Sequence, residues 1–140
     1  MDPSLIVQRK ARYTLGIKCI KKIDGLEHNN AFSKIISKGD NLYSDKEMLE
    51  AYYMNSSKAV IELYRTENDN VKFCDEKDED GEPIIHKFGE YIIDVGENFD
   101  ENDRKVLISI YLGGTFVTSS ATYCKTNKQK KVVYLLNFTD

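Results

Sequence analysis

The feature that most constrains the fold of this chain is a pair of alternating segments joined by two glycines. Residues 105–123 read KVLISIYLGGTFVTSSATY, with apolar and polar side chains alternating on both sides of Gly113 and Gly114. Alternation with a period of two is typical of strands, and adjacent glycines permit the positive φ angles that a two-residue hairpin turn requires. The segment therefore predicts a β-hairpin with its turn at the two glycines.

The same pattern recurs along the chain. Further strands are expected at residues 13–20, 32–38, 47–54, 58–65, 71–74, 84–95 and 132–138. Segment 47–54 is also compatible with two helical turns, but its Tyr52–Tyr53 pair favours a strand. Gly89 inside 84–95 predicts a bend or bulge. About eight short strands spaced about ten residues apart predict an all-β sandwich or barrel rather than βαβ units.

One acidic segment resembles part of a calcium loop. Glu76, Asp78 and Asp80 precede Gly81, but the twelfth position, where a bidentate Glu belongs, is occupied by Lys87. We expect a solvated connection between strands, with a loop-built calcium site as the alternative.

The cysteines and histidines do not have the spacing of a metal site. Cys19, Cys74 and Cys124 form no CxxC pair, and neither His28 nor His86 has a second ligand nearby in sequence. We expect buried, reduced thiols in a cytoplasmic protein, and no metal.

Charge and motifs exclude several classes of function. The chain has 20 basic and 23 acidic residues, a net charge of -3, which favours neither nucleic acid nor an anionic membrane. The lysine-rich segment 125–131 is expected to be a soluble turn. No apolar run reaches the roughly 18 residues of a membrane span, and no catalytic or nucleotide-binding motif occurs. We therefore expect no catalysis and no cofactor.

The order of several segments resembles that of a known family. These segments are RYTLGI (12–17), AVIELYRTENDN (59–70), KFCDE (72–76), FGEYIIDV (88–95) and the hairpin at 105–123. Together they resemble the C-terminal peptide-binding β-domain of the seventy-kilodalton heat-shock chaperones, and most closely the divergent branch described as heat shock 70 kDa protein 12-like. The resemblance extends over residues 12–138.

The resemblance implies an antiparallel β-sandwich over residues 12–140. Residues 1–11 would be the exit of an ATPase domain followed by a linker. The ATPase domain itself is missing from this chain, so no ATP binding is expected here. The chain stops just after the last expected strand, so no helical lid is expected either.

The resemblance also implies a cleft for an extended apolar peptide, held by backbone hydrogen bonds and pockets for alternate side chains. The positions carried over to this cleft are Ile17, Cys19, Ile20, Tyr52, Met54, Ala59, Ile61 and Val95. We expect Ile20 and Met54 to be exposed and Val95 to form the floor. The connection 21–31 is expected to be a long polar loop beside the cleft.

Two functions from different classes follow. The first is a lidless, chaperone-type module that binds extended or unfolded client peptides, with an ATPase domain in cis in a longer gene product. The second is an adaptor that keeps the sandwich but has lost the cleft. Exposure of Ile20, Met54 and Ile61 around a groove favours the first, whereas a filled groove favours the second.

Overall fold

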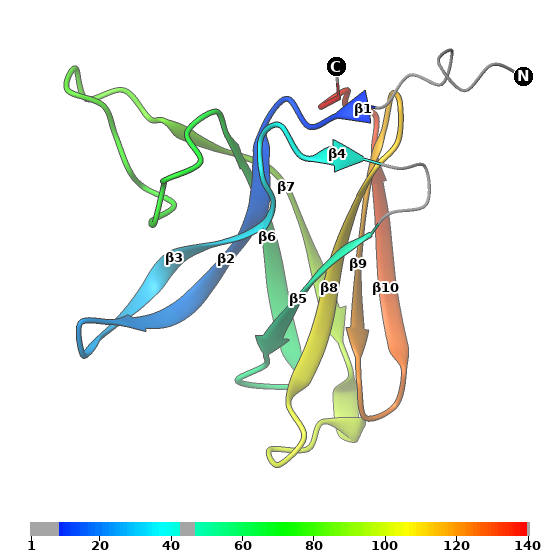
Figure 1. The fold of residues 1–140 in the computed structure, drawn as a ribbon. Coiled ribbons are helices and arrows are strands. Elements are labelled where there is room, and N and C mark those ends of the chain that lie inside the picture. The colour runs from blue at the N-terminus through cyan, green and yellow to red at the C-terminus, as the bar shows by residue number, and fades with distance from the viewer. Residues whose placement is uncertain (1–8, 43–46, 140) are drawn as a thin grey trace, which may run out of the picture.

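The computed structural model describes residues 9–42 and 47–139, which form two four-stranded antiparallel sheets packed face to face (Figure 1). The first sheet has the order β3 (Leu26–Ile36), β2 (Thr14–Ile23), β6 (Lys58–Thr66), β7 (Ile85–Asp94). The second has the order β10 (Lys128–Tyr134), β9 (Val117–Tyr123), β8 (Lys105–Leu112), β5 (Met48–Tyr53). The predicted all-β, antiparallel sandwich is confirmed, and its eight longer strands match the expected number.

Three short elements complete the described fold. β1 (Arg9–Lys10) pairs with β4 (Asn41–Leu42), and a 3-10 turn, η2 (Gly96–Asn98), precedes β8. Of the expected linker 1–11, residues 1–8 lie outside the described residues. Residues 9–11 pack into the domain, where Ala11 is buried and bridges Thr139.

The core lies between the two sheets and follows the period-two pattern of the sequence. In β9, for example, Val117, Ser119, Ala121 and Tyr123 are buried, while the residues between them face partly outward. Ser119 donates a hydrogen bond to the carbonyl of Ser109 at 2.9 Å. Because this bond uses the Ser119 hydroxyl proton, the Tyr91 hydroxyl donates to Ser119 Oγ. The alternation thus predicts which face is buried because a strand points successive side chains to opposite faces.

The turn of the β8–β9 hairpin differs from the prediction. The last pair is Leu112 with Val117, and the Gly113 N–H donates to the carbonyl of Phe116, so the loop has four residues. Neither Gly113 nor Gly114 has a positive φ. Instead, the Phe116 ring lies 2.3 Å from where a Cβ on Gly113 would be. Gly113 is needed for close packing, and the predicted two-residue turn is wrong.

The connection after β2 is also different. The expected loop 21–31 is a continuation of both strands, joined by a two-residue turn at Asp24 and Gly25 with φ values of 53° and 82°. An Asp-Gly pair with both φ angles positive forms the hairpin turn whose twist matches the flanking strands. The β2–β3 hairpin is therefore long, and its far end curls away from the sandwich (Figure 1).

Two other segments are corrected and one is confirmed. Residues 71–74 form no strand but lie along β3 through a single bridge between Phe73 and Ala31. The last strand begins at Lys128, so most of the lysine-rich segment is strand rather than turn. The pairing of β6 with β7 shifts register after Leu63, which lies opposite Gly89, and this confirms the predicted bulge. A Cβ added at Gly89 would lie 2.4 Å from the Tyr134 ring, so a side chain does not fit there.

Candidate functional site

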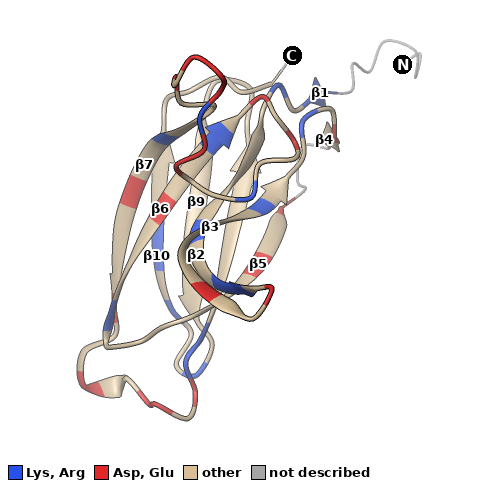
Figure 2. Ribbon diagram, turned by 90° about the vertical axis from the view of Figure 1, so that its left-hand side faces the viewer, with Lys and Arg blue, Asp and Glu red and all other residues tan. Residues whose placement is uncertain are grey.

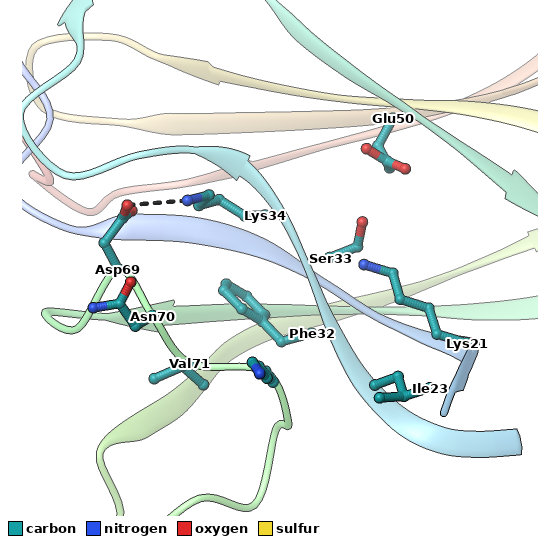
Figure 3. A pocket seen from close by; sticks show the side chains of 10 residues that line it. Lys21, Ile23, Phe32, Ser33, Lys34, Glu50, Asp69, Asn70 and Val71 are labelled. Atoms are coloured by element: carbon teal, nitrogen blue, oxygen red, sulfur yellow. Dashed lines mark hydrogen bonds and ion pairs between the residues drawn. The ribbon is translucent and has the colours of Figure 1, made fainter. Parts of the chain in front are cut away.

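A concave region of the described surface lies between the β2–β3 hairpin and β5. It consists of two hollows of about 350 and 510 Å³, which share Lys21, Ser33 and Glu50. We call the two hollows together the β5 groove. Such volumes are typical of ligand clefts in proteins. Figure 3 shows Glu50 of β5 across the larger hollow from Lys21 and Ser33.

The two hollows differ in their remaining walls. The smaller one is lined by Cys19, Ile20, Glu27, Ala51, Tyr52, Tyr53, Asn55 and Arg104. The larger one is lined by Ile23, Phe32, Lys34, Asp69, Asn70, Val71 and Lys72. The groove therefore runs along the edge of β5 and past the hairpin, with charged side chains on both walls.

The edge of β5 is open because of its place in the sheet. β5 pairs with β8 on one side only. The N–H of Met54 donates to the carbonyl of Arg104, and hydrogen-bonded pairs alternate along an antiparallel ladder. The backbone groups of Tyr52 and Glu50 therefore point to β8. Those of Leu49, Ala51 and Tyr53 point outward, and the described part of the chain offers them no backbone partner.

The other sheet edges are protected. Residues 72–74 cover β3, where Phe32 N–H donates to the Lys72 carbonyl and Cys74 N–H to the Asn30 carbonyl, both at 2.8 Å. β10 carries exposed lysines at 128, 130 and 131, which discourage pairing. β7 lies against β10, and the hydroxyl of Tyr134 donates to the Glu90 carbonyl. Among the described strands, β5 is the edge best suited to accept another strand.

The structure divides the eight predicted cleft residues into two groups. Cys19, Ile20 and Tyr52 come together in the smaller hollow, and Ile20 is 47% exposed. The other five are buried between the sheets; they are Ile17, Met54, Ala59, Ile61 and Val95. The expected exposure of Met54 is wrong, because its side chain is on the inner face of the sandwich and belongs to the main core. The apolar space expected to hold a peptide side chain is filled by the protein itself.

Burial affects two titratable groups of the smaller hollow, Cys19 and Tyr52. Burial raises the pKa of the Cys19 thiol, an effect that Lys21 opposes and the Glu50 carboxylate reinforces. The pKa of the Tyr52 hydroxyl is also raised, by burial first and by Cys19 and Glu62 next. Because a thiol becomes a strong nucleophile only as a thiolate, Cys19 contributes a small apolar surface at neutral pH.

An ion pair fixes one wall of the larger hollow. Thr14 Oγ1 donates to Asp69 Oδ1 at 2.7 Å, and Lys34 Nζ donates to Oδ2 at 3.0 Å (Figure 3). These hydrogen bonds, the one from Thr14 first, hold the pKa of Asp69 below its usual value. They anchor the β6–β7 connection to β2 and β3, and so position the residues that line this side of the groove.

We predict that Asp69 makes stability pH-dependent in the acid range. Its pKa is lower in the folded than in the unfolded state, so its stabilising effect is present above about pH 4 and is lost as pH falls further. Between pH 6 and pH 3, the urea midpoint of the wild type should fall more than that of Asp69→Asn. Asp75→Asn, which removes an exposed carboxylate of the same connection, should behave like the wild type. Equal falls in all three proteins would contradict the prediction.

The acidic segment 75–82 closes on itself. Asp78 Oδ1 accepts the N–H groups of Asp80 and Glu82, both at 2.9 Å. Glu76 accepts the N–H groups of Lys72 and Phe73. Figure 2 shows the acidic residues gathered on this connection and, at the other end of the molecule, on the segment between β7 and β8. Over residues 9–42 and 47–139, no three His, Cys, Asp or Glu side chains are placed to hold a metal ion.

The cysteines differ in burial, and one of the two histidines makes an aromatic contact. All three cysteines are free; Cys19 and Cys74 are half-buried, but Cys124 is exposed, so the expectation that all three are buried is wrong. Burial raises the pKa of Cys74 to about 12. The ring of His28 stacks on Phe73 with centroids 5.0 Å apart, which helps hold the covering segment on β3.

Sequence reasoning misses the residues that make the β5 groove polar. Lys21 and Glu27 fall in the expected loop 21–31, and Glu50 is only one residue of an expected strand. The Asp-Gly pair at 24–25 is the available signal, since it predicts a hairpin that carries Lys21 and Glu27 on paired strands. Glu50 carries no signal of its own, because its position depends on how two distant segments approach each other.

Comparisons with known proteins leave the family open. The sequence matches no protein-family model and no curated protein. In the part of the chain that the structure describes, no helix has the length and apolar character needed to cross a membrane.

Proposed function

We propose that this domain is a non-catalytic peptide-binding module of the chaperone type, which holds an extended segment of another polypeptide against β5. The observation that carries the proposal is the open edge of β5 inside a groove. Leu49, Ala51 and Tyr53 each present one N–H and one C=O on that edge, and Ala51 and Tyr53 line the groove. Addition of a strand to such an edge is a general way in which proteins bind extended peptides.

The position of the groove supports this proposal. Its smaller hollow lies beside the connection from β5 to β6 and beside the hairpin of β2 and β3, two segments that the chaperone resemblance leads us to expect near the cleft. Cys19, Ile20 and Tyr52, three residues carried over from that resemblance, line it. Client peptides would bind here without nucleotide, and any ATP dependence would require an ATPase domain in cis.

The expected affinity is modest. Each backbone hydrogen bond contributes about 0.5–1.5 kcal/mol net, and part of this is offset by ordering the peptide. A dissociation constant of about 1–100 μM, roughly −8 to −5 kcal/mol, is therefore expected. Exchange should be fast, since no segment among the described residues closes over the groove.

Alternate N-methylation of the peptide tests this proposal. Successive N–H groups of an extended peptide point in opposite directions, so only one alternate set can donate to β5. In fluorescence anisotropy, methylation of one set should abolish binding of a labelled heptapeptide, whereas methylation of the other should leave it nearly unchanged. Equal effects of the two sets would contradict strand addition.

The adaptor is the second candidate, and the filled core favours it. Met54, Ile61 and Val95 are buried, so no deep apolar pocket is available for a peptide side chain. If no heptapeptide binds at about 500 μM, roughly −4.5 kcal/mol, to a domain shown to be folded, the adaptor replaces the peptide-binding module.

A further inference from the structure

The two faces of β5 differ in chemistry. Leu49 and Tyr53 are 58% and 56% exposed on the outer face of the sheet, with Ala51 exposed between them. Met48, Glu50 and Tyr52 are half-buried on the other face. The outer face of the strand is therefore apolar, and the centre of its inner face is a carboxylate.

Glu50 occupies the middle of the β5 groove and lines both hollows. Among the described residues, no hydrogen bond or ion pair is found for its side chain, although it is half-buried. Across the groove, Lys21 is exposed, and Glu27 of the paired strand lies opposite Lys22. Glu50 is the one charged side chain of β5 itself, and it lines the groove.

The other cations of the groove lie on its walls and not on β5. Lys34 is paired with Asp69, as described above. The Arg104 guanidinium donates to the Met54 carbonyl and to Asn55 Oδ1, at the end of the groove beyond Tyr53. Lys72 belongs to the far wall of the larger hollow. A bound strand would therefore have one charged side chain of β5, Glu50, directly beside it.

A strand added to β5 would have to match these two faces. Its side chains alternate in step with those of β5, and the residue directly opposite Glu50 has its Cβ about 5 Å away on the same face. Its two neighbours would have their side chains on the outer face, beside Leu49 and Ala51. An apolar side chain opposite Glu50 would lie beside a carboxylate that is unpaired among the described residues, and the filled core beneath offers it no deeper site.

We propose that the segment bound at β5 is an alternating, amphipathic strand, with apolar side chains on the outer face and a lysine or arginine opposite Glu50. This inference rests on the function proposed above and narrows its ligand from apolar peptides in general to basic, alternating ones. Opposite charges paired across strands stabilise, and like charges destabilise.

Three labelled heptapeptides test this inference by fluorescence anisotropy at about 0.15 M salt, where the Debye length is about 8 Å. In the first peptide valine alternates with lysine, and in the second valine alternates with glutamate. The third peptide is uniformly apolar between short polar ends. We expect the lysine peptide to bind about two- to five-fold more tightly than either of the others. Glu50→Lys should reverse the order of the lysine and glutamate peptides.

The matched control is Glu97→Lys, which changes the net charge equally on the exposed η2 turn outside the groove. It should leave the preference unchanged. If the apolar peptide binds most tightly, or if Glu50→Lys acts no differently from Glu97→Lys, the inference is wrong while the proposed function stands. If no peptide binds to the folded protein, the proposed function fails and this inference fails with it.

Discussion

Replacing Ile61 by aspartate should unfold this protein, whereas the same replacement at the preceding residue should not. Ile61 is 1% exposed and packs in the main core, while Val60 is 48% exposed on the opposite face of β6. An aspartate at 61 would place a carboxylate among apolar side chains with no partner. The cost, about 4 kcal/mol or more, is comparable with the entire stability of many domains, about 5–15 kcal/mol.

Val60→Asp is the matched control, since it introduces the same side chain one residue away in the same strand. It should cost about 1 kcal/mol or less, from lower strand propensity and the loss of its contact with Ile92. Circular dichroism and urea unfolding distinguish the two variants. A folded Ile61→Asp protein with near-normal stability would mean that Ile61 is not in the core. Binding measurements on that variant would then test the cleft that the resemblance implies.

Gly16→Ala should also be strongly destabilising, although it adds a single methyl group. A Cβ at Gly16 would lie 2.1 Å from the Ser33 carbonyl oxygen and 2.8 Å from the Phe32 ring. The carbonyl belongs to the backbone of β3, so the strand itself would have to move. We expect a loss of about 1–3 kcal/mol or more, measured as a lower urea midpoint and melting temperature.

Gly114→Ala provides the control for this prediction. No atom lies within 4 Å of a Cβ at that position, and Gly114 does not have a positive φ. The substitution should change stability by less than about 0.5 kcal/mol. Because Gly16 pairs with Lys34, next to Ser33, its replacement should also displace the wall of the β5 groove and weaken any peptide binding. Equal stability of the two variants would contradict the close approach of β2 and β3.

Ile61 and Ile20 have different roles that a sequence cannot separate. Both are isoleucines in strands, and the resemblance carries both over to the cleft. The structure buries the first and leaves the second at the rim of the smaller hollow. Ile20→Asp is therefore the better variant for testing the cleft, since the exposed position should tolerate a charge with little effect on folding.

The strands and their buried faces were determined by the sequence alone. Alternation in 105–112, 117–123 and 58–66 marks each strand and its inner face, because the backbone of a strand turns successive side chains to opposite sides. The bulge at Gly89 was also predictable from a local signal, a glycine inside a strand. The two-residue turn at Asp24–Gly25 could also have been predicted, since Asp-Gly is a strong hairpin signal.

Only the tertiary structure decided which edge stays open and which apolar side chains remain accessible. Among the described strands, β5 is the edge strand that stays uncovered. Residues 72–74 cover β3, and β7 and β10 lie together, and both arrangements join segments far apart in the sequence. Met54 and Ile20 have similar hydrophobicity, but the packing of one sheet on the other buries the first and leaves the second exposed. The periodicity of a strand specifies which side chains share a face. Which elements cover that face, and which edge stays open, depends on non-local packing, which no local pattern encodes.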